Sequence, residues 1–396
     1  MECLSCPSAD RTWMPSYSIW SDSTWALSEP ETKAKFEELQ VGFPHHTRSP
    51  IVWSSSSFQA DDAYVFELES RYISEIEAAG AYFKTLNAPL SSISSSSFPL
   101  PVLGPILRDL ARAIHDGQGF HLLRGLNPKK YSAEMNCILY IGVSSYIGEV
   151  RGRQDEHGNM LIHLTDMGSI VAPDNERQAP YSNVSQPFHT DTGHVVALYA
   201  LGQAYVGGES KLASSSKIYN DIVKMRPDLV GVLAESSWTF DRFGRQPPYD
   251  IRPILFHEDQ KIIFAFARRP LLGSPTSPRT EGIPDLTERQ IEALNLVHFL
   301  AEKHAIQIKM QRGDMLFWNN MGLLHCRTGF TDSVCHKRHL VRLWLHNEER
   351  AWKVPVALRP DWEYTFSNAG REEQWPLEPI VDRKYVSLQQ RSCGHG

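Results

Sequence analysis

The chain has 396 residues, of which 41% are hydrophobic, and 40 Lys and Arg against 46 Asp and Glu give a formal net charge of −6. It is long enough to bury a core, and since it has no basic block we expect no nucleic-acid partner. No stretch approaches the roughly 18 consecutive apolar residues of a membrane span, and the first residues do not resemble a signal peptide, so we expect a cytoplasmic protein without membrane contact. Six cysteines are too few for a disulfide scaffold.

The N-terminal part offers few signals of regular structure. We expect residues 1–60 to form a partly irregular extension and residues 61–396 to form a single domain with helical insertions. Cys3 and Cys6 form a CxxC pair, but no second pair follows at zinc-finger spacing, so a tail is favoured over a metal site. The Ser- and Pro-rich stretch 89–101 suits a linker.

The first half of the chain combines helical patterns with isolated strands. Apolar residues recur at helical spacing in the stretches 70–86 and 103–118. A third helix is predicted at 133–148. Two short apolar runs, at 119–126 and 159–168, predict strands.

The second half is dominated by short β-rich runs separated by turn signals. These runs lie at 194–202, 211–219, 237–243, 254–267, 304–320 and 339–347. Two helical patterns interrupt them, at 218–235 and 286–304. Short strands with a few helices outside them predict a mainly β fold with flanking helices, either a β-sandwich or a jelly roll.

The stretch QPFHTDTGH places His189 and Asp191 two positions apart. In an extended segment, residues i and i+2 point to the same face, so the imidazole and the carboxylate converge while Thr190 faces away. Two histidines and one carboxylate on one face form the triad that binds Fe(II) and leaves positions open for other ligands. The best candidate for the second histidine is His325, because a Gly-Asp turn and a short strand precede it.

Two arginines lie in the following strand, KRHLVRLWL. Arg338 and Arg342 are four residues apart, so they share one face of the strand, and the apolar residues between them favour a position inside the barrel. A buried guanidinium is costly unless it meets an anion, and it recognises a carboxylate through two hydrogen bonds. Both arginines are therefore candidates for binding acidic ligands; an exposed, solvated strand edge is the alternative.

Four motifs in this order, FHTDTGH, GGES, GDMLFWNNMGLLHCR and RHLVRLWL, resemble those of the TauD/TfdA, clavaminate-synthase-like family of Fe(II)/2-oxoglutarate-dependent oxygenases, and those of its fungal branch above all. The resemblance covers about residues 65–366. It implies a double-stranded β-helix, which is a cupin-like jelly roll, and an enzyme that uses Fe(II), 2-oxoglutarate and O₂. It also implies that His189, Asp191 and His325 are the catalytic iron ligands.

The same resemblance implies roles for residues around the iron. Arg338 would bind the distal carboxylate of 2-oxoglutarate. Ser210 of GGES stands where the family commonly has a threonine that contacts this carboxylate, and Arg342 stands where several members bind an anionic group of the substrate. Gln186, three residues before His189, is a further candidate for substrate binding. Two motifs depart from the family: GGES replaces the commoner GGDT, which weakens the assignment of Ser210, and WNN replaces the commoner WDN without removing an iron ligand.

Other residues near these motifs have simpler explanations. The Pro-rich, aromatic stretch 241–253 is either an ordinary loop or a cover for the substrate. Surface or packing positions explain four further histidines: His163, His194, His339 and His346.

An intact Asp191 favours oxygen transfer, or another outcome of hydrogen abstraction, over halogenation, since iron halogenases in related folds have a small residue there. We expect a small carboxylate-bearing substrate, an amino acid or related acid, and hydroxylation, desaturation or oxidative cyclisation within fungal specialised metabolism. Two alternatives stay open: a taurine- or sulfonate-type catabolic dioxygenase, and a non-catalytic jelly roll that binds a metal or 2-oxoglutarate. The exterior helices could supply the interface of a homodimer.

Overall fold

The computed structural model describes residues 39–58, 63–174, 176–274, 278–367 and 370–387. Within these segments, no helix is long and apolar enough to cross a membrane. The pair Cys3 and Cys6 and most of the predicted N-terminal extension lie outside the described residues, and the division of the chain at residue 60 stays a prediction.

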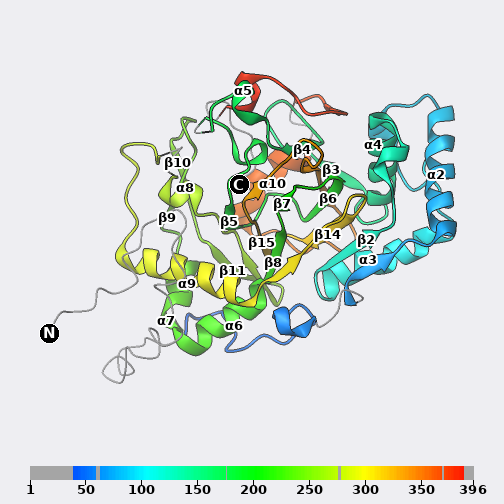
Figure 1. Cartoon of the computed structure of the whole chain (residues 1–396). Coiled ribbons are helices and arrows are strands. Elements are labelled where there is room, and N and C mark those ends of the chain that lie inside the picture. Colours follow the sequence, from blue (N-terminus) through cyan, green and yellow to red (C-terminus); the bar gives the residue numbers. More distant parts are fainter. Residues whose placement is uncertain (1–38, 59–62, 175, 275–277, 368–369, 388–396) are drawn as a thin grey trace.

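Two mainly antiparallel β-sheets form the centre of the molecule (Figure 1). The larger sheet has seven strands, in the spatial order β1 (Val65–Glu67), β2 (Phe120–Arg124), β14 (Met315–Asn319), β6 (Val195–Gly202), β17 (His339–His346) and β3 (Val150–Gly152), with β4 (Ile162–Thr165) also paired with β17. Only β1 and β2 run parallel among its described pairs. The smaller sheet has the order β13 (Ile306–Ile308), β8 (Ser210–Ser214), β15 (Leu323–Arg327) and β5 (Gln186–His189).

Three two-stranded units complete the described strands. Their pairs are β9 (Trp238–Asp241) with β10 (Tyr249–Arg252), β11 (Leu255–Glu258) with β12 (Lys261–Phe264), and β7 (Val206–Gly207) with β16 (Phe330–Thr331). The two facing sheets, together with these two-stranded units, form the jelly roll that the sequence predicted.

Alternation along each strand divides the core into layers. On β6, Val196 and Leu198 belong to a cluster that fills the space between the two sheets, where Leu212 and Leu323 of the smaller sheet meet them. The neighbouring residues of β6, such as Ala197, face the opposite way and pack against helices. Residues at even positions of β17 therefore point inward, which is the face that Arg338 and Arg342 were expected to share.

Two groups of helices cover the sheets (Figure 1). The outer face of the larger sheet packs against α2 (Ser70–Thr85), α3 (Leu103–Asp116) and α4 (Ala133–Ser144). The smaller sheet packs against α6 (Ser215–Met225), α7 (Asp228–Ala234) and α9 (Glu288–His304). The remaining helices are short: α5 (Gly168–Val171), α8 (Arg269–Leu272), α10 (Arg359–Phe366) and α11 (Arg383–Val386).

Local sequence explains where the long helices begin and end. Thr287 and Gln290 cap the start of α9 reciprocally, each side chain bonding the backbone N–H of the other. Ser132 accepts a hydrogen bond from the N–H of Met135 at the start of α4. Pro227 interrupts the helical pattern at 218–235, which forms α6 and α7 instead of one helix.

The prediction of a linker at 89–101 is wrong. Phe98 is fully buried, and a Cβ on Gly142 of α4 would lie 2.5 Å from its ring. The hydroxyl of Tyr146 donates to the carbonyl of Phe98 at 2.9 Å and accepts from the N–H of Leu100 at 2.8 Å. A few large apolar residues spaced among the serines are enough to anchor this segment in the core.

The predicted strand at 211–219 is only half correct. β8 ends at Ser214, whose hydroxyl accepts a hydrogen bond from the N–H of Lys217 at 3.1 Å and so caps α6. The run of serines is therefore a helix start, because serine favours the N-cap over a strand interior.

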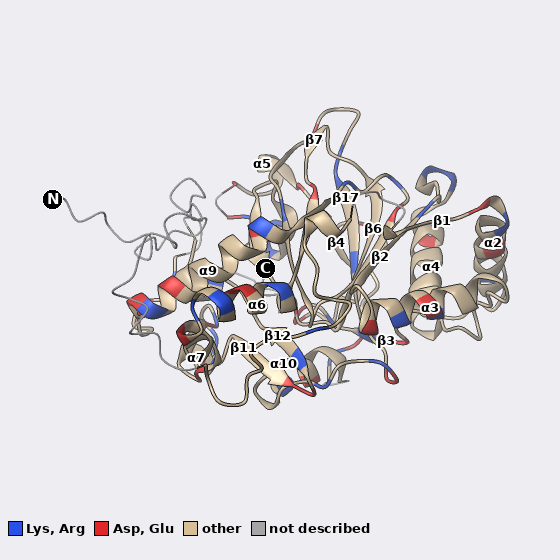
Figure 2. Ribbon diagram, turned by 90° about the horizontal axis from the view of Figure 1, so that it is seen from below, with Lys and Arg blue, Asp and Glu red and all other residues tan. Residues whose placement is uncertain are grey.

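Charged residues of both signs are interspersed on the helices that cover the smaller sheet (Figure 2). Both α9 and α6 carry Lys or Arg as well as Asp or Glu, and Lys217 of α6 bonds Asp221 one turn later at 2.5 Å. This face carries paired charges of the kind found on ordinary solvated helices.

Candidate active site

Two histidines of the smaller sheet lie side by side because their strands are paired. β5 and β15 run antiparallel, and their register puts His325 directly opposite His189. The two imidazole rings are 4.1 Å apart between centroids, and the ring of Trp318 lies 4.8 Å from that of His325. The backbone of the sheet therefore brings the predicted pair of histidines together.

Asp191 follows β5 in a turn that a buried amide fixes. The side chain of Asn320 accepts a hydrogen bond from the N–H of Asp191 at 2.9 Å and donates to the carbonyls of Asp191 and of the residue two positions later, at 2.7 and 2.8 Å. Thr190 points away, as predicted, and its hydroxyl accepts from the N–H of Phe266 at 3.0 Å. The departure from the family's WDN motif falls on Asn319 and leaves this amide in place.

The donor atoms of His189, Asp191 and His325 suit a divalent metal. One potential ligand atom of each residue lies within 4.8 Å of the other two. Nδ1 of His189 donates to the carbonyl of Pro187 at 2.9 Å, which leaves Nε2 for a metal, 3.8 Å from Oδ1 of Asp191. That Oδ1 is buried and has no hydrogen-bond partner in the described part of the chain, as expected for an atom that binds a metal.

Electrostatics keep the three side chains in the protonation states that a metal requires. Burial lowers the pKa of His189 and lowers that of His325 well below its usual value, so both imidazoles are neutral. Burial alone would raise the pKa of Asp191, but Arg342, the two histidines and the indole N–H of Trp344 outweigh it and lower the pKa to about 2. The carboxylate is therefore ionised at neutral pH.

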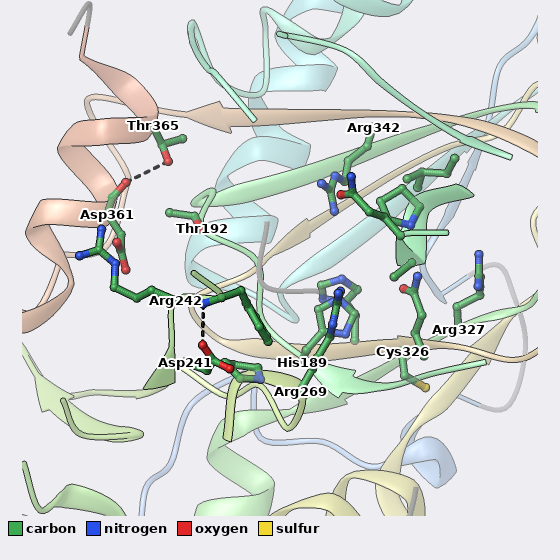
Figure 3. A pocket seen from close by; sticks show the side chains of 18 of the residues that line it. His189, Thr192, Asp241, Arg242, Arg269, Cys326, Arg327, Arg342, Asp361 and Thr365 are labelled. Atoms are coloured by element: carbon green, nitrogen blue, oxygen red, sulfur yellow. Dashed lines mark hydrogen bonds between the residues drawn. The ribbon is translucent and has the colours of Figure 1, made fainter. Parts of the chain in front are cut away.

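Arg342 lies on the inner face of β17 and contacts the triad directly. Its Nη1 donates to Oδ2 of Asp191 at 2.9 Å, and its Nε donates to Oε1 of Gln154 at 2.8 Å. Nε1 of Trp344 donates to the same oxygen of Asp191 at 3.0 Å. Nη2 of Arg342 makes no hydrogen bond to a described residue, and the side chain lines the cavity beside His189 (Figure 3). This nitrogen is therefore positioned to meet an acidic ligand.

Arg338 and Ser210 line another part of the same cavity. Nε of Arg338 donates to the carbonyl of Gly208 at 3.1 Å, and its guanidinium lies 5.4 Å from the centre of the Phe330 ring. Burial, followed by the charge of Arg327, lowers the pKa of Arg338 to about 9, so it stays charged at neutral pH. Gly208 has a φ of +77°, and a Cβ there would lie 2.8 Å from Cδ of Arg338, so only glycine leaves room for this side chain.

Comparison with known proteins places the chain in a family. The model of the "Taurine catabolism dioxygenase TauD, TfdA family" matches residues 86–344. The chain is 36% identical over 339 residues to the "Taurine hydroxylase-like protein SAT17" of Stachybotrys chartarum, with 83% of this chain and 88% of that relative covered. This chain belongs to the TauD/TfdA family of dioxygenases. It is also 23% identical over 315 residues to the "FR-33289 synthase" of Streptomyces rubellomurinus, covering 78% of this chain and 92% of that protein.

Solved structures share the fold of this dioxygenase. An asparagine oxygenase in complex with Fe(II), 3-hydroxyasparagine and succinate superposes with a TM-score of 0.57 at 16% identity, covering 71% of this chain and 93% of that one. The non-heme iron oxygenase OrfP, in complex with Fe and alpha-ketoglutaric acid, superposes with a TM-score of 0.51 at 14% identity, covering 72% and 94%. The predicted jelly roll with flanking helices is thus confirmed.

Family membership and the donor atoms of the triad together confirm the predicted enzyme class. The chain is a non-haem Fe(II)/2-oxoglutarate-dependent dioxygenase, with Fe(II), 2-oxoglutarate and O₂ as its cofactor and cosubstrates. The alternative of a non-catalytic jelly roll is therefore left without support. The roles of individual residues are proposals and are argued below.

A cavity of about 620 Å³ lies beside the triad of the dioxygenase, and His189 and His325 line it (Figure 3). The stretch 241–253 runs from the end of β9 through β10, and several of its residues line the wall, which favours its interpretation as a cover for the substrate over that of an ordinary loop. Sequence reasoning missed other wall residues, among them Glu156, Arg269, Asp361, Tyr364 and Thr365. These come from separate segments that only the folded chain brings together, and no motif marks them.

Gln186 and Arg327 also line the cavity. The pairing of β15 with β5 and β8 places Arg327 opposite Gln186 on one side and opposite Ser210 on the other. The sequence pointed to Gln186 but not to Arg327. The available signal was its position two residues after His325 in a strand, which predicts that both side chains point to the same face.

The other histidines are packing residues, as predicted. Nδ1 of His163 lies 2.8 Å from Nε2 of His339, and the Nδ1 atoms of His194 and His346 lie 2.6 Å apart. Both pairs use their ring nitrogens within the protein interior, and His339 points away from the face that carries Arg338.

Proposed function

We propose that His189, Asp191 and His325 bind the Fe(II) of this dioxygenase. The observation that carries the proposal is the approach of one donor atom from each residue to within 4.8 Å of the others, with Oδ1 of Asp191 buried and unpartnered among the described residues. When bound, the iron supplies C–H oxidation by O₂, coupled to conversion of 2-oxoglutarate into succinate and CO₂.

The chain's own contribution is to hold these ligands in place and in the correct charge state. The carbonyl of Pro187 fixes the tautomer of His189, and Arg342 with Trp344 keeps Oδ2 of Asp191 occupied, so that Oδ1 faces the metal position. Because the donors are set before a metal arrives, little reorganisation is needed on binding.

We propose that Arg338 binds the distal carboxylate of 2-oxoglutarate and that Ser210 assists. The buried guanidinium has no ion-pair partner within 4.0 Å in the described segments, so it requires an anion. The hydroxyl of Ser210 lines the same wall and makes no hydrogen bond to a described residue, which leaves it free to donate to the same carboxylate.

The substrate is a small carboxylate-bearing molecule, an amino acid or related acid, held by Nη2 of Arg342. Because Nη1 of this arginine is bonded to Asp191, the acidic group would lie close to the metal position. Gln186 completes the wall as a lesser contact. Structures of relatives in the fold contain hydroxylated amino acids, 3-hydroxyasparagine in one and hydroxyarginine in another, which supports this class of substrate.

The outcome would be hydroxylation, desaturation or oxidative cyclisation in fungal specialised metabolism. One relative from a fungus and one synthase from Streptomyces support a biosynthetic role. The description of the fungal relative as taurine hydroxylase-like also favours a second candidate, the oxidation of a taurine-like sulfonate. Arg342 can bind a sulfonate as it binds a carboxylate, since both present paired oxygens to a guanidinium.

The test is a substrate screen with purified protein, Fe(II), 2-oxoglutarate and O₂, in which succinate formed above the substrate-free background is measured for amino acids, related acids and taurine. An anionic substrate should raise succinate release, and Arg342→Lys, which keeps a cation beside Asp191, should raise its KM while the affinity for 2-oxoglutarate stays the same. Turnover restricted to compounds without an anionic group, or an unchanged KM in Arg342→Lys, would contradict the proposal.

Two finer features accompany this proposal. We expect a cytoplasmic location, where the buried thiols of Cys137 and Cys326 stay reduced, and a homodimer formed through exterior helices. Light scattering of the purified protein tests the dimer.

A further inference from the structure

The part of the cavity that holds Arg338 contains a second buried arginine. Arg327 lies two residues after His325 on β15, and its side chain points into the cavity wall (Figure 3). Both guanidinium groups lie near the same aromatic ring: those of Arg327 and Arg338 are 5.0 and 5.4 Å from the centre of the Phe330 ring. The proximity is also electrostatic, since the charge of Arg327 lowers the pKa of Arg338.

Neither guanidinium is neutralised by the protein. In the described part of the chain, no carboxylate lies within 4.0 Å of Arg327 or Arg338, although both residues are buried. Nε of Arg327 and Nη1 of Arg338 are enclosed without a hydrogen-bond partner. Nη1 of Arg327 and Nη2 of Arg338 also make no hydrogen bond to a described residue. Two buried positive charges with spare donors are stable only if an anion binds between or beside them.

Two other arginines of the cavity wall do have carboxylate partners. Arg342 is paired with Asp191 at 2.9 Å, and Arg242 with Asp250 at 3.4 Å. Arg252 has no carboxylate within 4.0 Å among the described residues either, but its Nη1 donates to the carbonyls of Pro253 and Ala265, and its guanidinium stacks on Phe240 at 3.7 Å. Arg327 and Arg338 differ from it because they lie together beside Phe330, at the end of the cavity where Ser210 lies opposite Arg327. A carboxylate has two oxygens and about four acceptor positions, so it can accept from two guanidinium groups at once.

We propose that Arg327 is a second cosubstrate-binding residue, which binds the distal carboxylate of 2-oxoglutarate together with Arg338. This inference rests on the proposed function, in which Arg338 binds that group. Nη2 of Arg327 donates to the carbonyl of Val184, and this bond holds the guanidinium in the wall. A pair of arginines makes the site more selective for a 2-oxo acid with a distal carboxylate than one arginine would.

A purely structural role for Arg327 is the competing explanation. In that case its bond to Val184 would only secure the segment before β5. Replacing Arg327 would then lower the free energy of unfolding but leave the preference for 2-oxoglutarate over a monocarboxylate unchanged. The two explanations therefore differ in the ratio of affinities for a dicarboxylate and a monocarboxylate.

The experiment measures binding by calorimetry on protein loaded with redox-inert Mn(II). The probes are 2-oxoglutarate and 2-oxopentanoate, which has the same carbon chain without the distal carboxylate. Arg327→Met should weaken binding of 2-oxoglutarate roughly 10- to 100-fold and leave that of 2-oxopentanoate unchanged. The matched control is Lys211→Met, because Lys211 lies beside Arg327 in the sheet but on the opposite face, where it bonds Glu302 at 2.8 Å. In this variant the ratio of the affinities for 2-oxoglutarate and 2-oxopentanoate should equal that of the wild type.

If the ratio of the affinities for 2-oxoglutarate and 2-oxopentanoate is the same in Arg327→Met as in the wild type, the proposal is overturned. If that variant does not fold, Arg327→Lys, which keeps a cation able to reach the carbonyl of Val184, replaces it. The proposal then requires weaker 2-oxoglutarate binding than in the wild type, because a lysine lacks the planar fork of a guanidinium, and equal binding would overturn it. A wild type that binds no 2-oxoglutarate would instead contradict the proposed function itself.

Discussion

Asn320 shows how one buried side chain can set the geometry of a metal site that it does not touch. Its amide bonds the backbone on both sides of the turn that carries Asp191, at 2.7 to 2.9 Å. No other described side chain fixes this turn through three bonds. The position of Asp191 relative to His189 therefore depends on an amide from the loop after β14.

Replacing Asn320 with alanine should weaken Fe(II) binding roughly 10- to 100-fold, as expected when a group that orients a metal ligand is lost. Anaerobic titration of the metal-free protein with Fe(II) measures this. The matched control is Asn319→Ala, since the neighbouring amide accepts from the N–H of Met321 at 3.0 Å and does not contact the turn. Equal losses of affinity in both variants would show that Asn320 has no specific role.

At the residue scale, the sequence revealed the parts of the site that lie in short motifs. His189 and Asp191 are two apart in one strand and turn, and His325 follows a recognisable turn and strand, so their convergence could be predicted from strand periodicity. Arg269 and Asp361 could not be predicted, because they come from helix α8 and helix α10, whose placement over the cavity depends on tertiary packing.

Between elements, α6 and α9 are joined by a partly buried carboxylate. Asp221 of α6 accepts from Nζ of Lys217 at 2.5 Å and from Nε2 of His304, the last residue of α9, at 2.6 Å. Burial would raise the pKa of Asp221, but these two hydrogen bonds and charges outweigh it and lower the pKa to about 2. The ionised carboxylate therefore stabilises the packing of the two helices over the smaller sheet.

A pH dependence follows from this lowered pKa. The folded pKa of Asp221 lies below its ordinary value of 3.8, so its contribution to stability is present above that value and is lost as pH falls toward about 2. Asp221→Asn should lower the free energy of unfolding by about 1–2 kcal/mol at pH 7, and the difference from the wild type should shrink below about pH 4. Urea unfolding at several pH values measures it; a difference independent of pH would refute the electrostatic origin.

At the scale of elements, the helical patterns and end signals of the sequence predicted α2, α3, α4 and α9 to within a few residues. The prediction failed in two serine-rich stretches, where the amino-acid composition suggested one structure and the tertiary packing produces another. The serines of 89–101 suggested a linker, yet Phe98 is anchored against α4, and the serines at 214–216 cap a helix instead of extending a strand.

For the whole molecule, the two sheets bring the residues proposed to bind iron, cosubstrate and substrate together around one cavity. The strands β17, β15 and β8 supply Arg342, His325 and Ser210, respectively, and Arg338 lies directly before β17. The jelly roll could be inferred from short strands and the family motifs, whereas the shape of the cavity depends on loops whose positions the sequence does not specify. Enzyme class was therefore predictable, and the identity of the substrate was not.

The most direct test of the account is anaerobic addition of Fe(II) and then 2-oxoglutarate to metal-free protein, followed by visible absorption spectroscopy. A weak metal-to-ligand charge-transfer band should appear in the wild type, since chelated 2-oxoglutarate requires an iron site with open positions. It should be lost in His189→Ala, and in Arg338→Ala it should need a higher 2-oxoglutarate concentration. Absence of the band from wild-type protein that binds one Fe(II), or its persistence in His189→Ala, would contradict the assignment of the triad.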